Sequence, residues 1–245
     1  MMKKAGFLTI LFLFTSFASI HAQSNEKLKL FFKLSDYFLK RHVYKGLVNY
    51  QYSSKNSGEI DLLHKTIGEV DLTGAAADEK KAFYINAYNV LVIYQVTTSY
   101  PLARPLDKEG FFDGTTYNVA GEMLNLNELE SERMLRTYED PRFHFVLACG
   151  AISCPPLHNL AYMPDGIEEL MEERTRLALN DENFIYLDKG SNTVKVSKIF
   201  EWYKDDFGGT SKSTIDFINK YREEKIPGDY KLETYEYDWT LNERT

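Results

Sequence analysis

The sequence lacks the short motifs that would name a reaction. It contains no glycine-rich phosphate loop, no HExxH or GxSxG motif and no paired dinucleotide-binding signature. Basic residues are also scarce, 29 against 36 acidic ones, which gives a formal net charge of -7. Nucleic acids and anionic membrane surfaces attract positive charge, and this chain is negatively charged. We therefore expect no nucleic-acid partner.

Long apolar runs are equally scarce, and only residues 7–20 form one. This run follows Lys3 and Lys4 and ends at small residues around Ala22, the order typical of a secretory signal peptide. We therefore predict a signal peptide over residues 1–22 and export of the mature protein to the periplasm or the extracellular space, a retained anchor being the alternative. No cysteine stands directly after the run, which argues against a lipid anchor. No later apolar run is long enough to span a bilayer. We expect no integral membrane segment in the mature chain.

The remaining residues, 23–245, have the composition of one folded domain. Hydrophobic residues make up 44% and aromatic residues 14% of the chain, which suffices for a packed core and excludes disorder. We find no internal repeat, low-complexity tract or linker. Apolar periodicity and capping residues predict helices over 27–43, 59–70, 78–97, 127–138, 165–179, 197–206 and 213–224.

Strand patterns are fewer and shorter. The run 143–149 is apolar on both faces, which predicts a central strand. Further strands are predicted at 184–187, 193–196 and 230–239, and a hairpin turn at 113–114. The helix predicted over 78–97 is apolar nearly all round and should be buried on most sides. We expect an α+β fold, with a mostly antiparallel sheet packed against this buried central helix and several amphipathic helices around them.

The two cysteines, Cys149 and Cys154, lie in one segment, PRFHFVLACGAISCPP. In an exported protein, two cysteines most simply form a disulfide. The alternative is a thiol nucleophile activated by a histidine base such as His144 or His158. Alternation along a regular strand would put His144 and Cys149 on opposite faces, unless the strand breaks near Ala148. Both interpretations stay open from the residues alone.

A metal site is a third interpretation of this segment. His144, Cys149, Cys154 and His158 follow the spacing H-x4-C-x4-C-x3-H, a set of ligands that zinc accepts. A closed site of four ligands would be structural. A histidine in an apolar strand, however, more often makes one buried hydrogen bond, and the spacing only borders on finger-like patterns. We expect neither a metal nor a cofactor.

Two amides lie on one face of the buried helix. Asn86 and Asn89 are three residues apart, and a buried amide is costly unless it is hydrogen-bonded. We expect them to bind backbone groups, for example in the loop 149–156, as a structural clamp. In the functional alternative, one amide orients a catalytic histidine or polarises a carbonyl. Glu130, on the helix predicted over 127–138, is another candidate to orient a histidine.

Four segments together resemble the domain of unknown function 547 family. They are AFYINAYNVLVIY, LNLNELESERMLR, DPRFHFVLACGAISCPPL and VKVSKIFEWYKDDFG, which are similar to the family patterns FWINxYN, IE…LR, DPRIHFALxCGAxSCP and LSxIFxWYxxDFG. The resemblance spans about residues 28–221, with Tyr84 in place of the usual Trp and Leu129 in place of Ile. It implies no established reaction, cofactor or catalytic residue. The family has intracellular members with the same paired cysteines, which favours thiol chemistry.

We therefore expect a thiol-dependent hydrolase or acyl transferase that acts on a peptide or amide in the cell envelope. Cys149 would be the nucleophile, with Cys154 as its substitute, His144 the base, and Glu130 or Asn86 the group that orients it. The alternative is a non-catalytic envelope binding or scaffold domain, in which a Cys149–Cys154 disulfide stiffens a recognition loop. Thiol–disulfide exchange is a third hypothesis, although the spacing is wider than CxxC. The expected partner is an unidentified peptide or small molecule.

Overall fold

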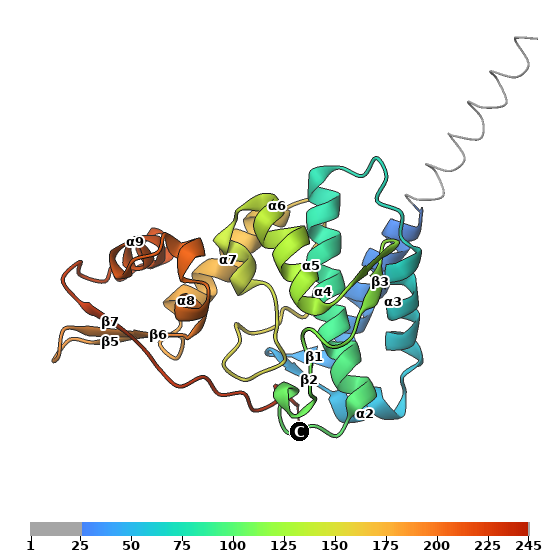
Figure 1. Cartoon of the computed structure of the whole chain (residues 1–245), viewed down its shortest axis with the longest axis horizontal. Coiled ribbons are helices and arrows are strands. Elements are labelled where there is room, and N and C mark those ends of the chain that lie inside the picture. Colours follow the sequence, from blue (N-terminus) through green and yellow to red (C-terminus); the bar gives the residue numbers. More distant parts are fainter. Residues whose placement is uncertain (1–25, 245) are drawn as a thin grey trace, which may run out of the picture.

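The hydrophobic side chains gather in two clusters. The molecule is elongated, and the ribbon shows most of the helices towards one end and a small sheet at the other (Figure 1). The structure, a computed structural model, describes residues 26–244. The signal peptide predicted over 1–22 lies outside this range. Within it, none of the helices combines the length and the apolar character needed to cross a membrane.

The first cluster surrounds α4 (Ala77–Ser99), the helix predicted over 78–97. Most of its side chains are buried, as its sequence, apolar all round, predicts. It ends before the Tyr100-Pro101 pair, because a proline disfavours helical geometry in the residue that precedes it. Around it lie a helix through residues 26–42, the hairpin of β1 (Val43–Tyr44) and β2 (Leu47–Val48), α2 (Tyr50–Lys55) and α3 (Gly58–Glu69).

The hairpin in this region turns later than predicted. β3 (Tyr117–Val119) pairs antiparallel with β4 (Glu122–Leu124), so the turn is at Ala120 and Gly121 and not at 113–114. Both turn residues have positive φ, 51° and 88°, as the tight two-residue turn between twisted strands requires. Residues 113–114 lie in an earlier turn, and the amide of the second of them donates to the Gly110 carbonyl at 2.8 Å.

The helix predicted over 127–138 is present but begins earlier. It consists of α5 (Leu126–Glu130), a π-helical turn η2 (Ser131–Leu135) and α6 (Arg136–Tyr138). Its capping box is Asn125 with Glu128, joined by reciprocal backbone bonds of 2.8 and 2.9 Å, and not Asn127 with Glu130. The same sequence pattern occurs twice here, two residues apart. The earlier cap leaves the Glu130 side chain free to face the interior.

The prediction of a central strand at 143–149 is wrong. Pro141–Phe145 form a 3-10 helix, η3, and a loop follows it. Asp140 caps this helix by accepting from the Arg142 amide at 2.9 Å, and Pro141 fits the first turn, so the local start signal prevails over the apolar run. The fold is α+β, but its sheets have only two or three strands, and residues 143–149 belong to none of them.

The second cluster lies around a three-stranded sheet. β5 (Ile185–Asp188) and β6 (Thr193–Val196) pair antiparallel, as predicted, and β7 (Lys231–Thr234) pairs with β6 in parallel. Only these four residues of the strand predicted over 230–239 join the sheet. The helices of this end are α7 (Ile167–Asn180), α8 (Ile199–Trp202), the 3-10 turn η4 (Lys204–Phe207) and α9 (Ser211–Tyr221). The helix predicted over 197–206 is thus broken in two.

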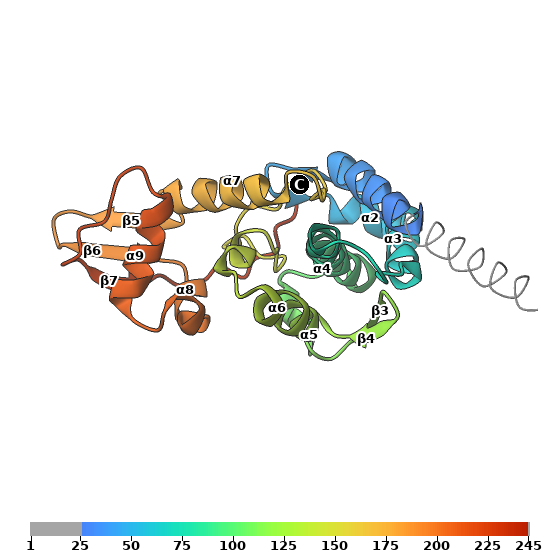
Figure 2. The ribbon, with the colours of Figure 1, turned by 90° about the horizontal axis from the view of Figure 1, so that it is seen from above.

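After β7 the chain returns to the first cluster, and we call residues 235–244 the C-terminal segment. It crosses from the sheet towards β2 and α2 (Figures 1 and 2). On the way it pairs with the loop 149–154: Ile152 donates to Thr240 at 2.8 Å, and Asn242 donates to Gly150 at 2.9 Å. At its end, Arg244 donates to Val48 at 2.8 Å. The segment therefore lies between the two clusters and forms one wall of the space there.

Candidate functional site

A pocket of about 270 Å³ lies between the two clusters. Of the five candidate site residues, four line it, namely Glu130, His144, Cys149 and Cys154, and Asn86 does not. The wall also carries aromatic side chains from α4, from the turn before β3, from α8 and the residue after it, and from the C-terminal segment: Tyr88, Phe112, Trp202, Tyr203, Tyr237 and Trp239. Segments far apart in the sequence therefore meet at one site.

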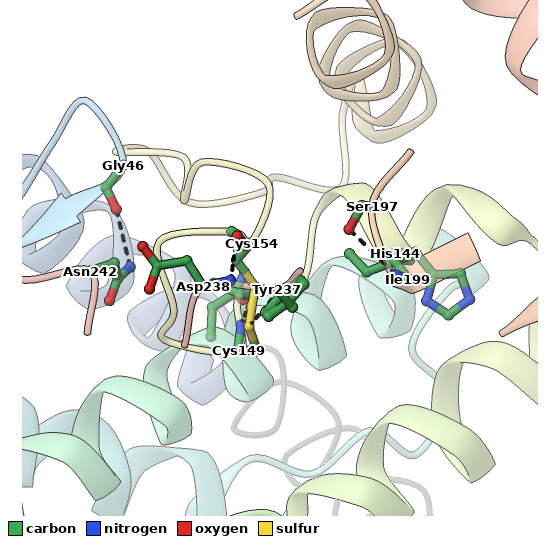
Figure 3. Close-up of a disulfide and its surroundings, with 12 residues drawn as sticks. Gly46, His144, Cys149, Cys154, Ser197, Ile199, Tyr237, Asp238 and Asn242 are labelled. Carbon is green, nitrogen blue, oxygen red and sulfur yellow. Dashed lines mark hydrogen bonds between the residues drawn. A yellow bond between two sulfur atoms is a disulfide. The ribbon is translucent and has the colours of Figure 1, made fainter. Parts of the chain in front are cut away.

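The two cysteines are joined in a disulfide (Figure 3). Their Cα atoms are 6.2 Å apart, within the usual range for this bond. The Cys149 amide donates to the Cys154 sulfur at 2.8 Å, and the Cys149 sulfur lies 3.1 Å from the Tyr237 hydroxyl. Gly150, between them, has φ 81°, a conformation that favours glycine. In this state the pocket wall offers a disulfide and no thiol.

His144 is buried and its partners are carboxylates. Its Nε2 lies 2.7 Å from Asp206 Oδ2, and its Nδ1 lies 4.0 Å from Glu130 Oε1. Because an ionised carboxylate only accepts hydrogen bonds, Nε2 carries a proton, and Nδ1 faces Glu130. In the view of Figure 3, Tyr237 lies between the imidazole and the disulfide. The sequence prediction missed Asp206, although it belongs to the DFG end of the fourth motif.

Glu130 lies at the polar end of the pocket, only 9% exposed. Burial raises the pKa of Tyr88, Tyr203 and Tyr237, and the negative charge of Glu130 adds to each shift. These phenols therefore stay protonated at neutral pH and can donate hydrogen bonds to Glu130 or to a ligand. The pocket combines an anionic acceptor with protonated hydroxyl donors.

The two amides of α4 act as clamps beneath the pocket. Asn89 donates to the Val146 carbonyl at 2.9 Å and accepts from the Ala148 amide at 2.8 Å, which fixes the loop just before Cys149. Asn86 makes the same pair of bonds to Tyr162, at 2.7 and 2.9 Å, and also donates to Ala82. The polar atoms of the Asn86 amide are thus used within the fold. The structural interpretation fits both residues. The partners of Asn89 lie just before the loop 149–156, and Tyr162, the partner of Asn86, lies just after it.

Three rings form one continuous surface, which we call the aromatic wall: Trp202, Tyr237 and Trp239. Their centroids lie 4.9 Å apart for Trp202 and Tyr237, 4.8 Å for Tyr237 and Trp239, and 5.8 Å for the two tryptophans. Trp202 is 46% exposed and lies at the opening. Trp202 belongs to the fourth motif, but it was not among the candidate site residues. Tyr237 and Trp239 carried no signal, because their place depends on where the C-terminal segment returns.

The zinc arrangement weighed from the sequence is not assembled. Cys149 and Cys154 are bonded to each other, and His158 packs on Tyr162 with ring centroids 5.9 Å apart. Among residues 26–244, no group of three or more His, Cys, Asp or Glu side chains could hold a metal ion. Asp206, His144 and Glu130 form a line of acid, imidazole and acid, which suits hydrogen bonding and proton transfer with a bound molecule.

Comparison with known families identifies the central part of the chain. Residues 72–177 match the family described as "Protein of unknown function, DUF547". Neither the curated proteins nor the solved structures contain a match. The matched range holds the first three motifs and contributes Glu130, His144 and both cysteines, whereas Asp206 and the aromatic wall come from outside it. The central region of the chain, residues 72–177, is therefore similar to the DUF547 family.

Proposed function

We propose that the pocket binds a small ligand without cleaving it, and that the Cys149–Cys154 disulfide stiffens its wall. The observation that carries this proposal is the disulfide itself, since the one sulfur pair in the wall is oxidised and His144 is bonded to Asp206. A sulfur in a disulfide is not a nucleophile, because the thiolate is the reactive form. This is the binding-domain alternative drawn from the sequence.

The way the pocket is built supports binding. Asn89 fixes one edge of the loop, the disulfide closes it, and backbone bonds from the C-terminal segment hold its other edge. A wall fixed on three sides loses little conformational entropy when a ligand binds. The volume, about 270 Å³, lies just below the roughly 300–1,000 Å³ of pockets for drug-sized ligands, which suggests a smaller molecule.

We further propose that binding takes place outside the cytoplasm. Disulfides persist in oxidising compartments such as the periplasm and the extracellular space, and are rare in the cytosol. The signal-peptide pattern over 1–22 agrees with this location.

The test uses the two tryptophans of the chain, Trp202 and Trp239, both of which line the pocket. Small molecules are screened by tryptophan fluorescence under non-reducing conditions, and those that respond are checked by ligand-observed NMR. Trp202→Ala should weaken binding in the NMR assay. Tyr186→Ala, which removes a ring of similar exposure, 53%, on β5, should leave it unchanged. A ligand that binds both variants equally, or hydrolysis of it by the oxidised protein, would refute the proposal.

A thiol-dependent hydrolase or acyl transferase acting on a peptide or amide is the second candidate. It is favoured by one observation: Cys149 shares the pocket with His144 and Glu130. This chemistry needs the disulfide to be reduced and Cys149 to come within reach of a base. The test is amide or ester hydrolysis by the protein with and without reductant. Turnover that appears on reduction and disappears in Cys149→Ser would support this candidate over a binding domain.

A further inference from the structure

We propose that the ligand carries a positively charged ammonium group, held between Glu130 and the aromatic wall. The inference rests on the proposed function, because it names the chemical class of the ligand for the same pocket. Its first support is the charge of the lining. Glu130 lines the pocket, Asp206 lies directly behind His144, and no lysine or arginine of the described chain is among the lining residues.

Glu130 is a buried carboxylate whose basic neighbour is weakly placed. The His144 ring is 4.0 Å away and gives its short bond, 2.7 Å, to Asp206. Even a protonated His144 would balance only one of the two carboxylates, so the site keeps a net negative charge. A buried charge is costly unless an opposite charge or hydrogen bonds compensate it. A cationic ligand would supply that charge, and an anionic ligand would add repulsion.

The second support is the aromatic wall. An ammonium group is attracted to the face of Trp most strongly, and also of Tyr, within about 6 Å of the ring centroid. Trp202, Tyr237 and Trp239 lie within 4.8 to 5.8 Å of one another, so a single ammonium group can contact more than one ring. Pockets that recognise quaternary ammonium groups are lined by aromatic faces for this reason.

The wall and the acid act on the same space. Glu130 lines the same pocket as all three rings of the aromatic wall. A neutral sugar could also stack on the wall and donate a hydroxyl to Glu130, but it would bring no positive charge to the carboxylate. An ammonium group satisfies both features at once.

The experiment compares two cations with a neutral isostere in the full-length oxidised protein. Choline represents a quaternary ammonium ion, butylammonium a protonated primary amine, and 3,3-dimethylbutan-1-ol is the uncharged analogue of choline. Binding is measured by tryptophan fluorescence and by calorimetry. We expect at least one cation to bind tenfold or more tightly than the neutral alcohol.

The matched variants lie on one helical run. Glu130→Gln should remove the preference for the cation. Glu132→Gln, two residues along and paired with Arg136 at the surface, should keep it. Trp202→Leu keeps an apolar side chain at the opening but loses the strong indole face, so it should weaken the cation several-fold more than the alcohol. This variant carries the test if Glu130→Gln does not fold.

The outcomes separate the two proposals. Equal binding of choline and its neutral analogue, or binding of neutral sugars with no binding of either cation, overturns the ammonium inference and leaves the binding function intact. An unchanged cation preference in Glu130→Gln also overturns it. If no small molecule binds the oxidised protein, whether cationic, neutral or anionic, the proposed function and the inference both fail.

Discussion

Removal of the disulfide should destabilise the protein by about 2 kcal/mol. The change is the double variant Cys149→Ala with Cys154→Ala. The bond closes a short loop, with a sequence separation of 5. The loss of loop-closure entropy in the unfolded chain is then about 7 cal/mol/K, or about 2 kcal/mol at 25 °C. For a chain of this size, that corresponds to a fall of roughly 4–8 °C in Tm.

The assay is urea unfolding of the double variant and of the wild type, each with and without dithiothreitol. Reductant should reproduce the loss in the wild type and have no effect on the double variant, which makes the variant its own control. The variant should still bind the pocket ligand, although more weakly, because the C-terminal segment and Asn89 still hold the loop. A loss below about 0.5 kcal/mol, or the same effect of reductant on both proteins, would contradict a closed disulfide in the native state.

Three further results are expected. Asn89→Ala leaves two buried backbone groups unpaired and should cost about 2–4 kcal/mol in urea unfolding, and a loss below about 1 kcal/mol would contradict the clamp. Burial raises the pKa of Tyr203 and Tyr237, so stability should fall as pH rises above about 10, where only the unfolded chain releases these protons; a spectrophotometric titration in which all tyrosines ionise together near pH 10 without unfolding would refute this. Burial lowers the pKa of His158, so stability should fall as pH drops below about 6.5, where the unfolded chain binds the proton first. His158→Gln should flatten this slope, measured by unfolding between pH 5 and 7, and an unchanged slope would count against the assignment.

The helices were more predictable than the strands, because the signals for a helix are local. α4 follows from an apolar pattern with no wet face and from the proline that ends it. The run 143–149 has an equally apolar pattern. A strand needs a partner strand, however, and the residues of a short segment do not show whether a partner lies beside it. Here Asn89 on α4 takes the place of a neighbouring strand by binding Val146 and Ala148.

The candidate site was predictable in part for a similar reason. Glu130, His144 and the cysteines stood out because polar or reactive side chains lay next to apolar runs, and the structure brings all of them to one pocket. The pairing of His144 with Asp206 joins residues 62 positions apart. The place of Tyr237 depends on the path of the C-terminal segment. Such long-range contacts are set by packing, which one sequence does not display.

The most direct test of a binding pocket with a closed disulfide is the alkylation of the native protein. The purified protein, never exposed to reductant, is treated with iodoacetamide and its intact mass is measured. We predict no added group before reduction and two after reduction and unfolding, one on each of Cys149 and Cys154. A single group on Cys149 in the unreduced, folded protein would contradict the binding proposal and favour a thiol nucleophile.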